Sequence, residues 1–149
     1  MNDDTAEFLN SAIFFAIDPD DAKCRFLNMT ASDFQKPFID AAEKFVSGFR
    51  SFLKKEGFDM PLLANLDYPF GSSIFWSLNG SGPGFEDETF DGFDSLPYYL
   101  EKYGRNKTRF AEVLERMSVV EDEHGNEQIH VSGDIEELFK IAEVTNDKG

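Results

Sequence analysis

Three glycines, Gly80, Gly82 and Gly84, lie between an apolar segment and an acidic one, and their spacing first suggests a phosphate-binding loop. Such loops read G-x-G-x-x-G between a strand and a helix, or carry a lysine after the glycines. Here the spacing is G-x-G-x-G, no lysine follows, and the acids at 86–88 repel phosphate. The glycines are therefore predicted to form a tight turn, for which Asn79-Gly80 is a typical dipeptide.

Residue types and spacing also argue against a nucleophile or a metal site. Ser81 lies in G-S-G and not in a G-x-S-x-G elbow, and the only histidines, His124 and His130, belong to a different predicted hairpin. One cysteine and two histidines do not make a zinc site. Segment 87–95 has EF-hand spacing, but its last ligand position falls on Tyr98. The sequence thus predicts no catalytic residue, no metal and no cofactor.

Acidic residues dominate the charge of the chain and are unevenly placed. Fourteen Lys and Arg stand against 29 Asp and Glu, for a net charge of −15, and residues 56–101 contain no Lys or Arg. Such a field repels nucleic acid and anionic membranes and attracts basic surfaces, although acid can also serve only to keep a small domain soluble. The residues expected to bind a partner are Glu86, Asp87, Glu88, Asp91, Asp94, Glu121, Asp122 and Glu123.

The length and composition indicate a folded protein. Residues 1–149 are expected to form a single globular domain, frayed at both ends, and the 17 Phe argue for a core and against a disordered acidic chain. The single Cys24 cannot form an intramolecular disulfide, and the N-terminus is too acidic for a signal peptide. No apolar run approaches the about 20 residues of a membrane span. We expect a cytoplasmic protein.

Helical periodicity predicts two helices in the first third of the chain. Segment 3–19 is expected to form the first, with Thr5 as its cap and with Phe14 and Phe15 widening the apolar face so that both sides are covered. A separate turn capped by Ser32 and Gln35 is expected before the longest helix. That helix is expected to run from Pro37 to Lys55, with Gly57 at its C-terminal end.

The rest of the chain predicts an α+β fold. Strands are expected at 73–78 and 84–90, around the glycines, and a second hairpin at 118–133 with its turn at 124–126. Further helices are expected at 93–104, 106–117 and 132–144. The sum is a small antiparallel sheet of about four strands in two hairpins, packed by four to five helices.

The glycine block resembles a family of small uncharacterised proteins of phages and plasmids, whose signature reads roughly D-F-W-L-T-R-N-G-H-G-A-G-F-W-D. The segment SIFWSLNGSGPGFED aligns with it without a gap. The matching residues are Asn79, Gly80, Gly82, Gly84, Phe85 and Asp87. The family's Arg, His and second aromatic are replaced by Leu78, Ser81 and Glu86. The resemblance implies a mobile-element protein made inside a bacterial cell and, by analogy, a decoy for host machinery that binds nucleic acid.

Two interpretations of the function follow. In the first, the chain is a non-enzymatic decoy whose carboxylates imitate phosphates and block a basic nucleic-acid-binding complex of the host, such as a restriction or CRISPR effector. The decoy binds neither nucleic acid nor membrane and is a monomer or a dimer. In the second, it is an adaptor or assembly protein of the phage or plasmid. The adaptor binds through exposed aromatic residues, namely Trp76, Phe90, Phe93, Tyr98 and Tyr99. An enzyme with an unrecognised site is a third, less favoured interpretation.

Overall fold

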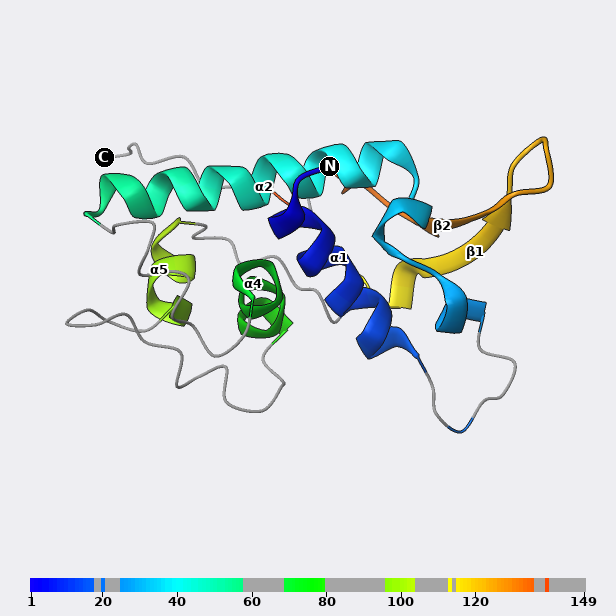
Figure 1. Cartoon of the computed structure of the whole chain (residues 1–149), viewed down its shortest axis with the longest axis horizontal. Coiled ribbons are helices and arrows are strands. Elements are labelled where there is room, and N and C mark those ends of the chain that lie inside the picture. Colours follow the sequence, from blue (N-terminus) through cyan, green and yellow to red (C-terminus); the bar gives the residue numbers. More distant parts are fainter. Residues whose placement is uncertain are drawn as a thin grey trace.

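The structure, a computed structural model, combines helices with a small antiparallel sheet, which confirms the α+β class (Figure 1). It describes residues 1–17, 20, 25–57, 69–79, 96–103, 113, 115–135 and 139. The helices are α1 (Asp3–Ala16), α2 (Lys36–Lys55), α4 (Phe70–Asn79) and α5 (Leu96–Tyr103), and two short 3-10 turns are η1 (Arg25–Asn28) and η2 (Ala31–Asp33). The strands are β1 (Met117–Glu121) and β2 (Glu127–Val131).

Helix α1 is capped by Asn2 and not by Thr5, the residue that the sequence predicts as its cap. The side chain of Asn2 accepts the N–H of Thr5 at 2.8 Å, so Asn2 is the cap and Thr5 lies inside the first turn, fully buried. Asn is a strong N-cap residue, and the carboxylates of Asp3 and Asp4 favour the positive end of the helix dipole. The prediction of the helix is therefore confirmed, and that of its cap is wrong.

The expectation that both sides of α1 are covered is also wrong. Phe14 is 70% exposed and Phe15 is 42% exposed. At about 3.6 residues per turn, the face that buries Phe8 and Ala12 leaves position 14 on the opposite side of the helix. Phe15 lies on the same side of the helix as Phe8, next to the C-terminal end, and its ring centroid is 6.4 Å from the ring of Phe75.

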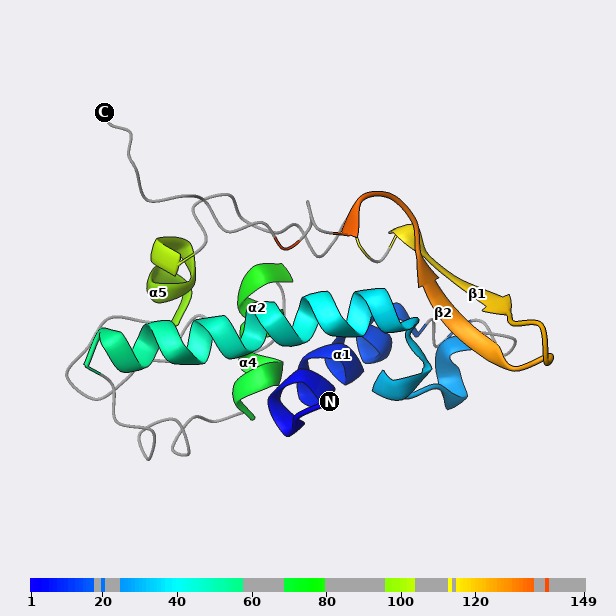
Figure 2. The same cartoon turned by 90° about the horizontal axis from the view of Figure 1, so that it is seen from above.

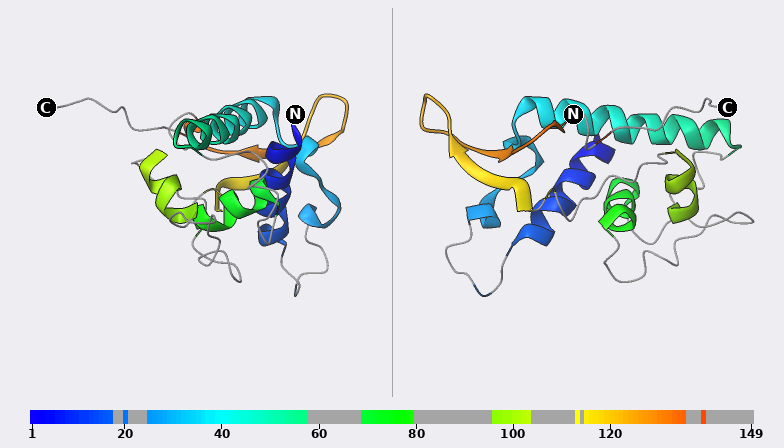
Figure 3. Two further views of the ribbon diagram at one scale, coloured as in Figure 1. Left: turned by 60° about the vertical axis from the view of Figure 1, so that its left-hand side comes forward. Right: turned by 180° about the vertical axis from the view of Figure 1, so that it is seen from behind.

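Helix α2 carries the apolar stripe that its sequence predicts. Its buried residues are Phe38, Ala42, Phe45, Val46, Phe49 and Leu53. The helix ends as expected, with Lys54 and Lys55 in the last turn and Gly57 at a φ of 97°, a conformation that glycine adopts readily. The 20-residue helix lies along α1, α4 and α5, which Figures 1 and 3 show side by side beneath it.

The separate turn before α2 is confirmed, but other residues cap it. In η2 the carboxylate of Asp33 accepts the N–H of Thr30 at 2.8 Å, in place of the expected pair of Ser32 and Gln35. Gln35 instead stands at the N-cap of α2, with Pro37 in the first turn, where the missing N–H of proline does no harm.

Segment 73–78 forms part of helix α4, so the prediction of a strand there is wrong. The run is apolar with serines and has no charged face, and such a short run does not distinguish a buried strand from a buried helix. Phe70, Ser73, Ile74 and Phe75 are all buried, and α4 packs between α1 and α5 (Figure 1). A helix enclosed on several sides needs no polar face.

Helix α5 confirms the helix expected over 93–104 for the residues that the structure describes. Tyr103 at its end donates its hydroxyl hydrogen to the carbonyl oxygen of Phe45 in α2 at 3.0 Å. Burial raises the pKa of Tyr103 to about 12, so this hydroxyl remains a donor throughout the neutral range. A side chain at Gly48 would collide with the Tyr103 hydroxyl, and this explains a glycine in the middle of α2.

The second hairpin is confirmed. Strands β1 and β2 are antiparallel, with Met117 opposite Val131 and Glu121 opposite Glu127. The turn contains Gly125 at a φ of 81°, as its position predicts. Met117, expected as the last residue of a helix, begins β1 instead.

The hairpin is joined to the start of α2. The N–H of Gln35 donates to the carbonyl oxygen of Ile129 at 3.0 Å, and the Gln35 side-chain oxygen lies 2.8 Å from Nδ1 of His130. On the inner face Met117, Ile129 and Val131 are buried. Figure 2 shows the far end of the hairpin extending beyond the helices. Glu121, Asp122 and Glu123 are thus carried at a protruding end of the molecule.

Several predictions fall outside the described residues. The strand at 84–90 and most of the helix at 132–144 lie there, and of the helix at 106–117 the structure describes Val113, Glu115 and Arg116 as helical. The described residues contain one hairpin of two strands and do not bear out the full expectation of four strands and four to five helices. A single domain over 1–149 stays a prediction. Among the described helices, none has the length and apolar character to cross a membrane.

Candidate functional site

The residues predicted to bind a partner divide into two groups. Glu121, Asp122 and Glu123 lie together at the end of the hairpin. The others lie outside the described residues, so their positions stay predictions; they are Glu86, Asp87, Glu88, Asp91 and Asp94. The glycines that precede them, and Ser81, also lie outside.

Asp122 holds the turn together. One of its carboxylate oxygens, Oδ1, accepts the N–H of His124 at 2.8 Å and the N–H of Asn126 at 2.9 Å. Its own N–H donates to the Asn126 carbonyl at 2.9 Å, and its carbonyl accepts the N–H of Gly125 at 3.0 Å. The hydrogen bond from the Asn126 N–H, with that from His124, lowers the pKa of Asp122 below its usual value. This carboxylate is therefore a structural element of the turn, as well as a charge.

A fourth carboxylate, which the sequence analysis missed, completes the cluster. Glu127 lies directly opposite Glu121 in the hairpin, and both side chains are exposed. We call Glu121, Asp122, Glu123 and Glu127 the acidic turn. Counting outward from the turn at 124–126 would have paired these two glutamates. Like charges directly opposite each other on a hairpin are destabilising, so this arrangement does not help the hairpin to fold.

Replacing Asp122 with alanine is expected to lower the melting temperature at pH 7. A lowered pKa means that the charged carboxylate favours the folded state, so its contribution is complete above pH 3.8 and is lost as the pH falls through the lowered pKa. The difference in melting temperature between the wild type and Asp122→Ala should therefore narrow in acid. Asp122→Asn, which keeps an oxygen acceptor, should lose less. An equal melting temperature for all three proteins at pH 7 would contradict the structural role.

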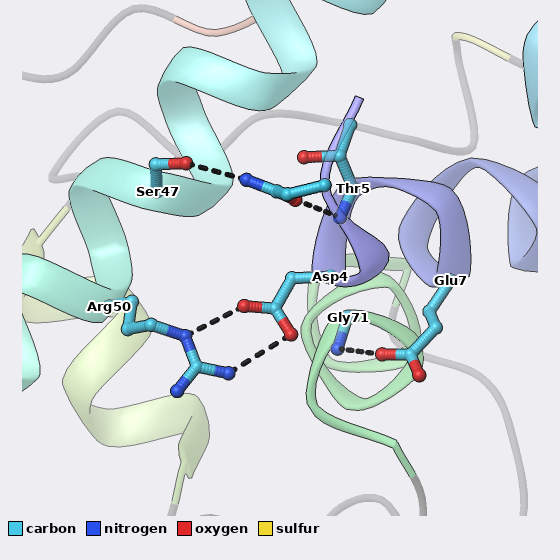
Figure 4. A network of polar contacts seen from close by, with 7 residues as sticks. Asp4, Thr5, Glu7, Ser47, Arg50 and Gly71 are labelled. Carbon is cyan, nitrogen blue, oxygen red and sulfur yellow. Dashed lines mark hydrogen bonds and ion pairs between the residues drawn. The ribbon is translucent and has the colours of Figure 1, made fainter. Parts of the chain in front are cut away.

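A second polar cluster joins three helices near the N-terminus (Figure 4). Arg50 of α2 makes a bidentate ion pair with Asp4 of α1, with N–O distances of 2.7 and 3.0 Å, and its guanidinium lies 4.5 Å from the ring centroid of Phe70 in α4. The N–H of Gly71 in α4 points at the carboxylate of Glu7 at 3.4 Å. Every one of these groups faces another helix, so the cluster serves packing.

Glu7 is the group in this cluster whose charge opposes the fold. Burial raises its pKa above 4.5, and Asp4 and Asp3 raise it further, against the Gly71 N–H and Arg50, which lower it. A raised pKa favours the protonated form in the folded state, so this contribution is complete below pH 4.5 and is lost as the pH rises through the raised pKa.

Glu7→Gln is therefore expected to raise the melting temperature at pH 7, because the amide keeps the acceptor for Gly71 and removes the charge. The gain should shrink when unfolding is repeated below pH 4.5. Glu43→Gln on α2 provides a control with the same chemical change. If the control and Glu7→Gln behave alike at both pH values, the burial argument for Glu7 is wrong.

The aromatic residues of the alternative interpretation are only partly accounted for. Tyr99 is 8% exposed, so its assignment as an exposed binding residue is wrong: α5 directs it toward the core. The side chains of Trp76, Phe90, Phe93 and Tyr98 lie outside the described residues. Among the side chains that the structure describes, the large apolar ones that are exposed are Met1, Phe14, Phe15 and Leu27.

The described residues offer no constellation for catalysis or metal binding. His124 lies in the turn, where its Nε2 is 3.6 Å from a carboxylate oxygen of Glu123, and His130 contacts Gln35. Within the described ranges, no group of three or more His, Cys, Asp or Glu side chains is placed to hold a metal ion. The acidic turn is therefore the best candidate for a functional site in this part of the chain.

Comparisons of the chain with family models, with curated proteins and with solved structures each found no match. The resemblance of the glycine block to proteins of phages and plasmids therefore stays a prediction.

Proposed function

We propose that the protein is a non-enzymatic acidic decoy of a phage or another mobile element, which acts in the cytoplasm of the host cell. Its carboxylates bind the basic channel of a host complex that handles nucleic acid, such as a restriction or CRISPR effector, and block access of the nucleic acid. The partner is thus a basic protein surface, and neither nucleic acid nor membrane is bound directly.

The acidic turn is the observation that supports this proposal. Four carboxylates gather at one end of the hairpin, and residues 117–139 contain no Lys or Arg. Two of the four, Glu121 and Glu127, are directly opposite each other, and such a like-charge pair does not itself favour pairing of the strands. A cluster of like charges that protrudes from the fold is better explained by binding than by folding. If the acidic residues served only to keep the protein soluble, acids spread over the surface would do so equally well.

The turn also presents these charges in a fixed arrangement. Asp122 is held by three hydrogen-bond donors, from His124 and from the backbone and side chain of Asn126. Because the backbone of the turn is fixed, the flanking glutamates lose little backbone freedom when they meet a partner. Preorganised charges of one sign steer a basic surface toward the site, and this attraction weakens as salt is added.

The test begins with capture of the partner from a host lysate at low salt, followed by mass spectrometry. A decoy should capture a basic nucleic-acid-binding complex, should release it as salt is raised, and should prevent that complex from binding its nucleic acid. Capture of proteins without a basic channel, in a form that resists salt, would contradict the proposal.

Neutralising the acidic turn is expected to weaken binding to the captured partner about tenfold at low salt and to flatten the salt dependence. The triple variant Glu121→Gln, Glu123→Gln, Glu127→Gln leaves the structural Asp122 intact. Each exposed charge contributes at most about 1 kcal/mol, so only the sum is large. Melting temperature should hold or rise, because like charges are removed.

The matched control removes three charges elsewhere: Asp3→Asn, Asp40→Asn and Glu43→Gln, on α1 and α2. If this control loses as much affinity as the triple variant of the acidic turn, only the net charge matters. If neither loses affinity, the acidic turn is removed from the proposal, and the acids at 86–94 remain to be tested in the same way.

The adaptor function is a second candidate, and one observation favours it. Phe14 is 70% exposed, with Phe15 on the same helix and Leu27 in η1 also exposed. An apolar contact changes little with salt. Binding that persists at high salt and is lost in Phe14→Ser, but not in the triple variant of the acidic turn, would favour the adaptor over the decoy.

A further inference from the structure

The outer edge of β1 has backbone groups that face away from the hairpin. Hydrogen bonds from the Ser132 N–H to the Arg116 carbonyl, at 3.1 Å, and from the Asp122 N–H to the Asn126 carbonyl, at 2.9 Å, fix the ladder at both ends. Antiparallel strands alternate between residues that bond to the partner strand and residues that point outward. With this register the even-numbered residues of β1 face β2. The N–H and C=O groups of Met117, Val119 and Glu121 therefore point outward.

The two edges of the hairpin differ in how they are covered. On the β2 side, Ile129 bridges to Phe34 and accepts the Gln35 N–H. On the β1 side, no described segment pairs with the strand. Figure 2 shows β2 lying between β1 and the start of α2, so that β1 is the outer strand.

The edge of β1 lacks several of the devices that protect such strands, and the charged residue within the strand is Glu121. Proteins block exposed edges with lysine, proline or a bulge. Strand β1 reads Met-Ser-Val-Val-Glu, with none of these, and pairs with β2 in unbroken register. Acidic residues predominate around it: Glu115 on one side and Glu121 with Glu123 on the other are exposed, against the half-buried Arg116 directly before the strand.

These charges select the occupant of the edge. A second copy of the chain paired in parallel would place Glu121 beside Glu121, and an antiparallel copy centred on Val119 would bring Glu123 toward Glu115. In either arrangement glutamates of like charge approach each other, although the antiparallel one also brings Asp122 toward Arg116, and each of the two chains carries a net charge of −15. A segment with lysine or arginine meets the flanking glutamates favourably and still satisfies the backbone groups.

We propose that the outer edge of β1 binds an extended basic segment of a partner protein by β-strand addition. Backbone hydrogen bonds to Met117, Val119 and Glu121 supply the pairing, and the flanking glutamates select basic side chains. The proposal rests on the proposed function for the basic character of the partner, and adds the form in which part of that partner binds.

The first test uses a synthetic peptide as the probe. An acetylated peptide of about six residues that alternates lysine and valine has the usual length of a strand. Its control has the same sequence with alternate backbone nitrogens methylated on the edge that faces β1. Charge and side chains are then unchanged, and donation to β1 is lost. The unmethylated peptide should bind at least about tenfold more tightly, since that factor corresponds to one or two backbone hydrogen bonds.

Amide exchange locates the contact. In the unbound protein the amides of Val119 and Glu121 should exchange rapidly, and those of Ser118 and Val120, which face β2, should exchange slowly. Addition of the peptide should protect Val119 and Glu121. If these two amides remain unprotected in the saturated complex, the edge proposal is overturned.

A variant of the protein provides the second test. Val119→Pro removes an N–H that points outward. The N–H groups that donate to β2 remain, and proline is tolerated at edge positions of this kind. It should bind the peptide about tenfold more weakly than Val119→Thr, which keeps the N–H. Slow exchange at Val120 checks that the hairpin remains formed; if it does not, the methylated peptide and the amide protection still decide.

The outcomes separate this proposal from the proposed function. Equal affinity for both peptides, with loss of binding in the triple variant of the acidic turn, overturns strand addition and leaves charge recognition standing. Absence of peptide binding at low salt also overturns strand addition, while capture of a basic complex from the lysate still supports the decoy. Protection of Val119 by the peptide supports strand addition even where the captured partner shows no salt dependence.

Discussion

Gly71→Ala is expected to destabilise the protein by about 3 kcal/mol or more, because α1 and α4 touch through their backbones at this position. A Cβ at Gly71 would overlap the carbonyl oxygen of Asp4 and would lie 2.9 Å from the backbone nitrogen of Phe8. Backbone atoms cannot rotate away as a side chain can, so the two helices would have to separate. Separation would also draw Arg50 away from either Asp4 or Phe70.

Urea unfolding monitored by circular dichroism would measure this loss. Gly57→Ala is the matched control, because its Cβ meets nothing and only the positive φ of 97° is strained. That strain is expected to be worth about 1 kcal/mol. Equal losses in the two variants would mean that α1 and α4 are not packed as closely as described.

Phe8→Ala is expected to lower the free energy of unfolding by about 3–5 kcal/mol, the usual loss for a buried phenylalanine. Phe8 is fully buried, and its ring contacts those of Phe45, Phe75 and Phe139, with centroid distances of 6.5, 6.0 and 6.4 Å. These rings come from α1, α2, α4 and the C-terminal part of the chain. The cavity would therefore open where the elements meet, and neighbouring groups fixed in separate helices fill it poorly.

Phe14→Ala, on the same helix, is the control, since Phe14 is 70% exposed and its loss should change stability by no more than about 0.5 kcal/mol. Domains of this size have a total stability of about 5–15 kcal/mol, so Phe8→Ala is close to unfolding the protein. Phe8→Leu fills part of the space and provides an intermediate value if the alanine variant does not fold. A small loss in both Phe8 variants would contradict the central position of this ring.

The elements that periodicity and turn chemistry specify locally were predictable. Phenylalanines at helical spacing marked α2, and Gly125 between two β-rich runs marked the second hairpin. The predicted boundaries were less accurate. Asn2 and Thr30 are the N-cap residues in place of Thr5 and Ser32, because they make competing local hydrogen bonds. Caps a few residues apart differ by about 1 kcal/mol, which is too little for the sequence to decide.

Helix α4 was not predictable in this way, because its conformation depends on distant residues. Ser73 and Phe75 suit a strand as well as a helix, and the choice is made by α1 and α5, between which the segment is buried. The acidic turn was predictable except for Glu127, whose place follows from the register. The exposure of Phe14 and the burial of Tyr99 could not be predicted, because they depend on how the helices pack and not on composition.

The link between Gln35 and the hairpin has a consequence for the order of folding. Gln35 and His130 are separated by 95 residues along the chain, although they are in contact in the native protein. Contacts of such long range are slow to form, because a large loop must close first. On the ribosome, α1 and α2 leave the exit tunnel well before residues 127–131 are made. The N-terminal end of α2 therefore makes its native contacts only after the hairpin has been synthesised. Docking of the hairpin is expected to be a late step of folding.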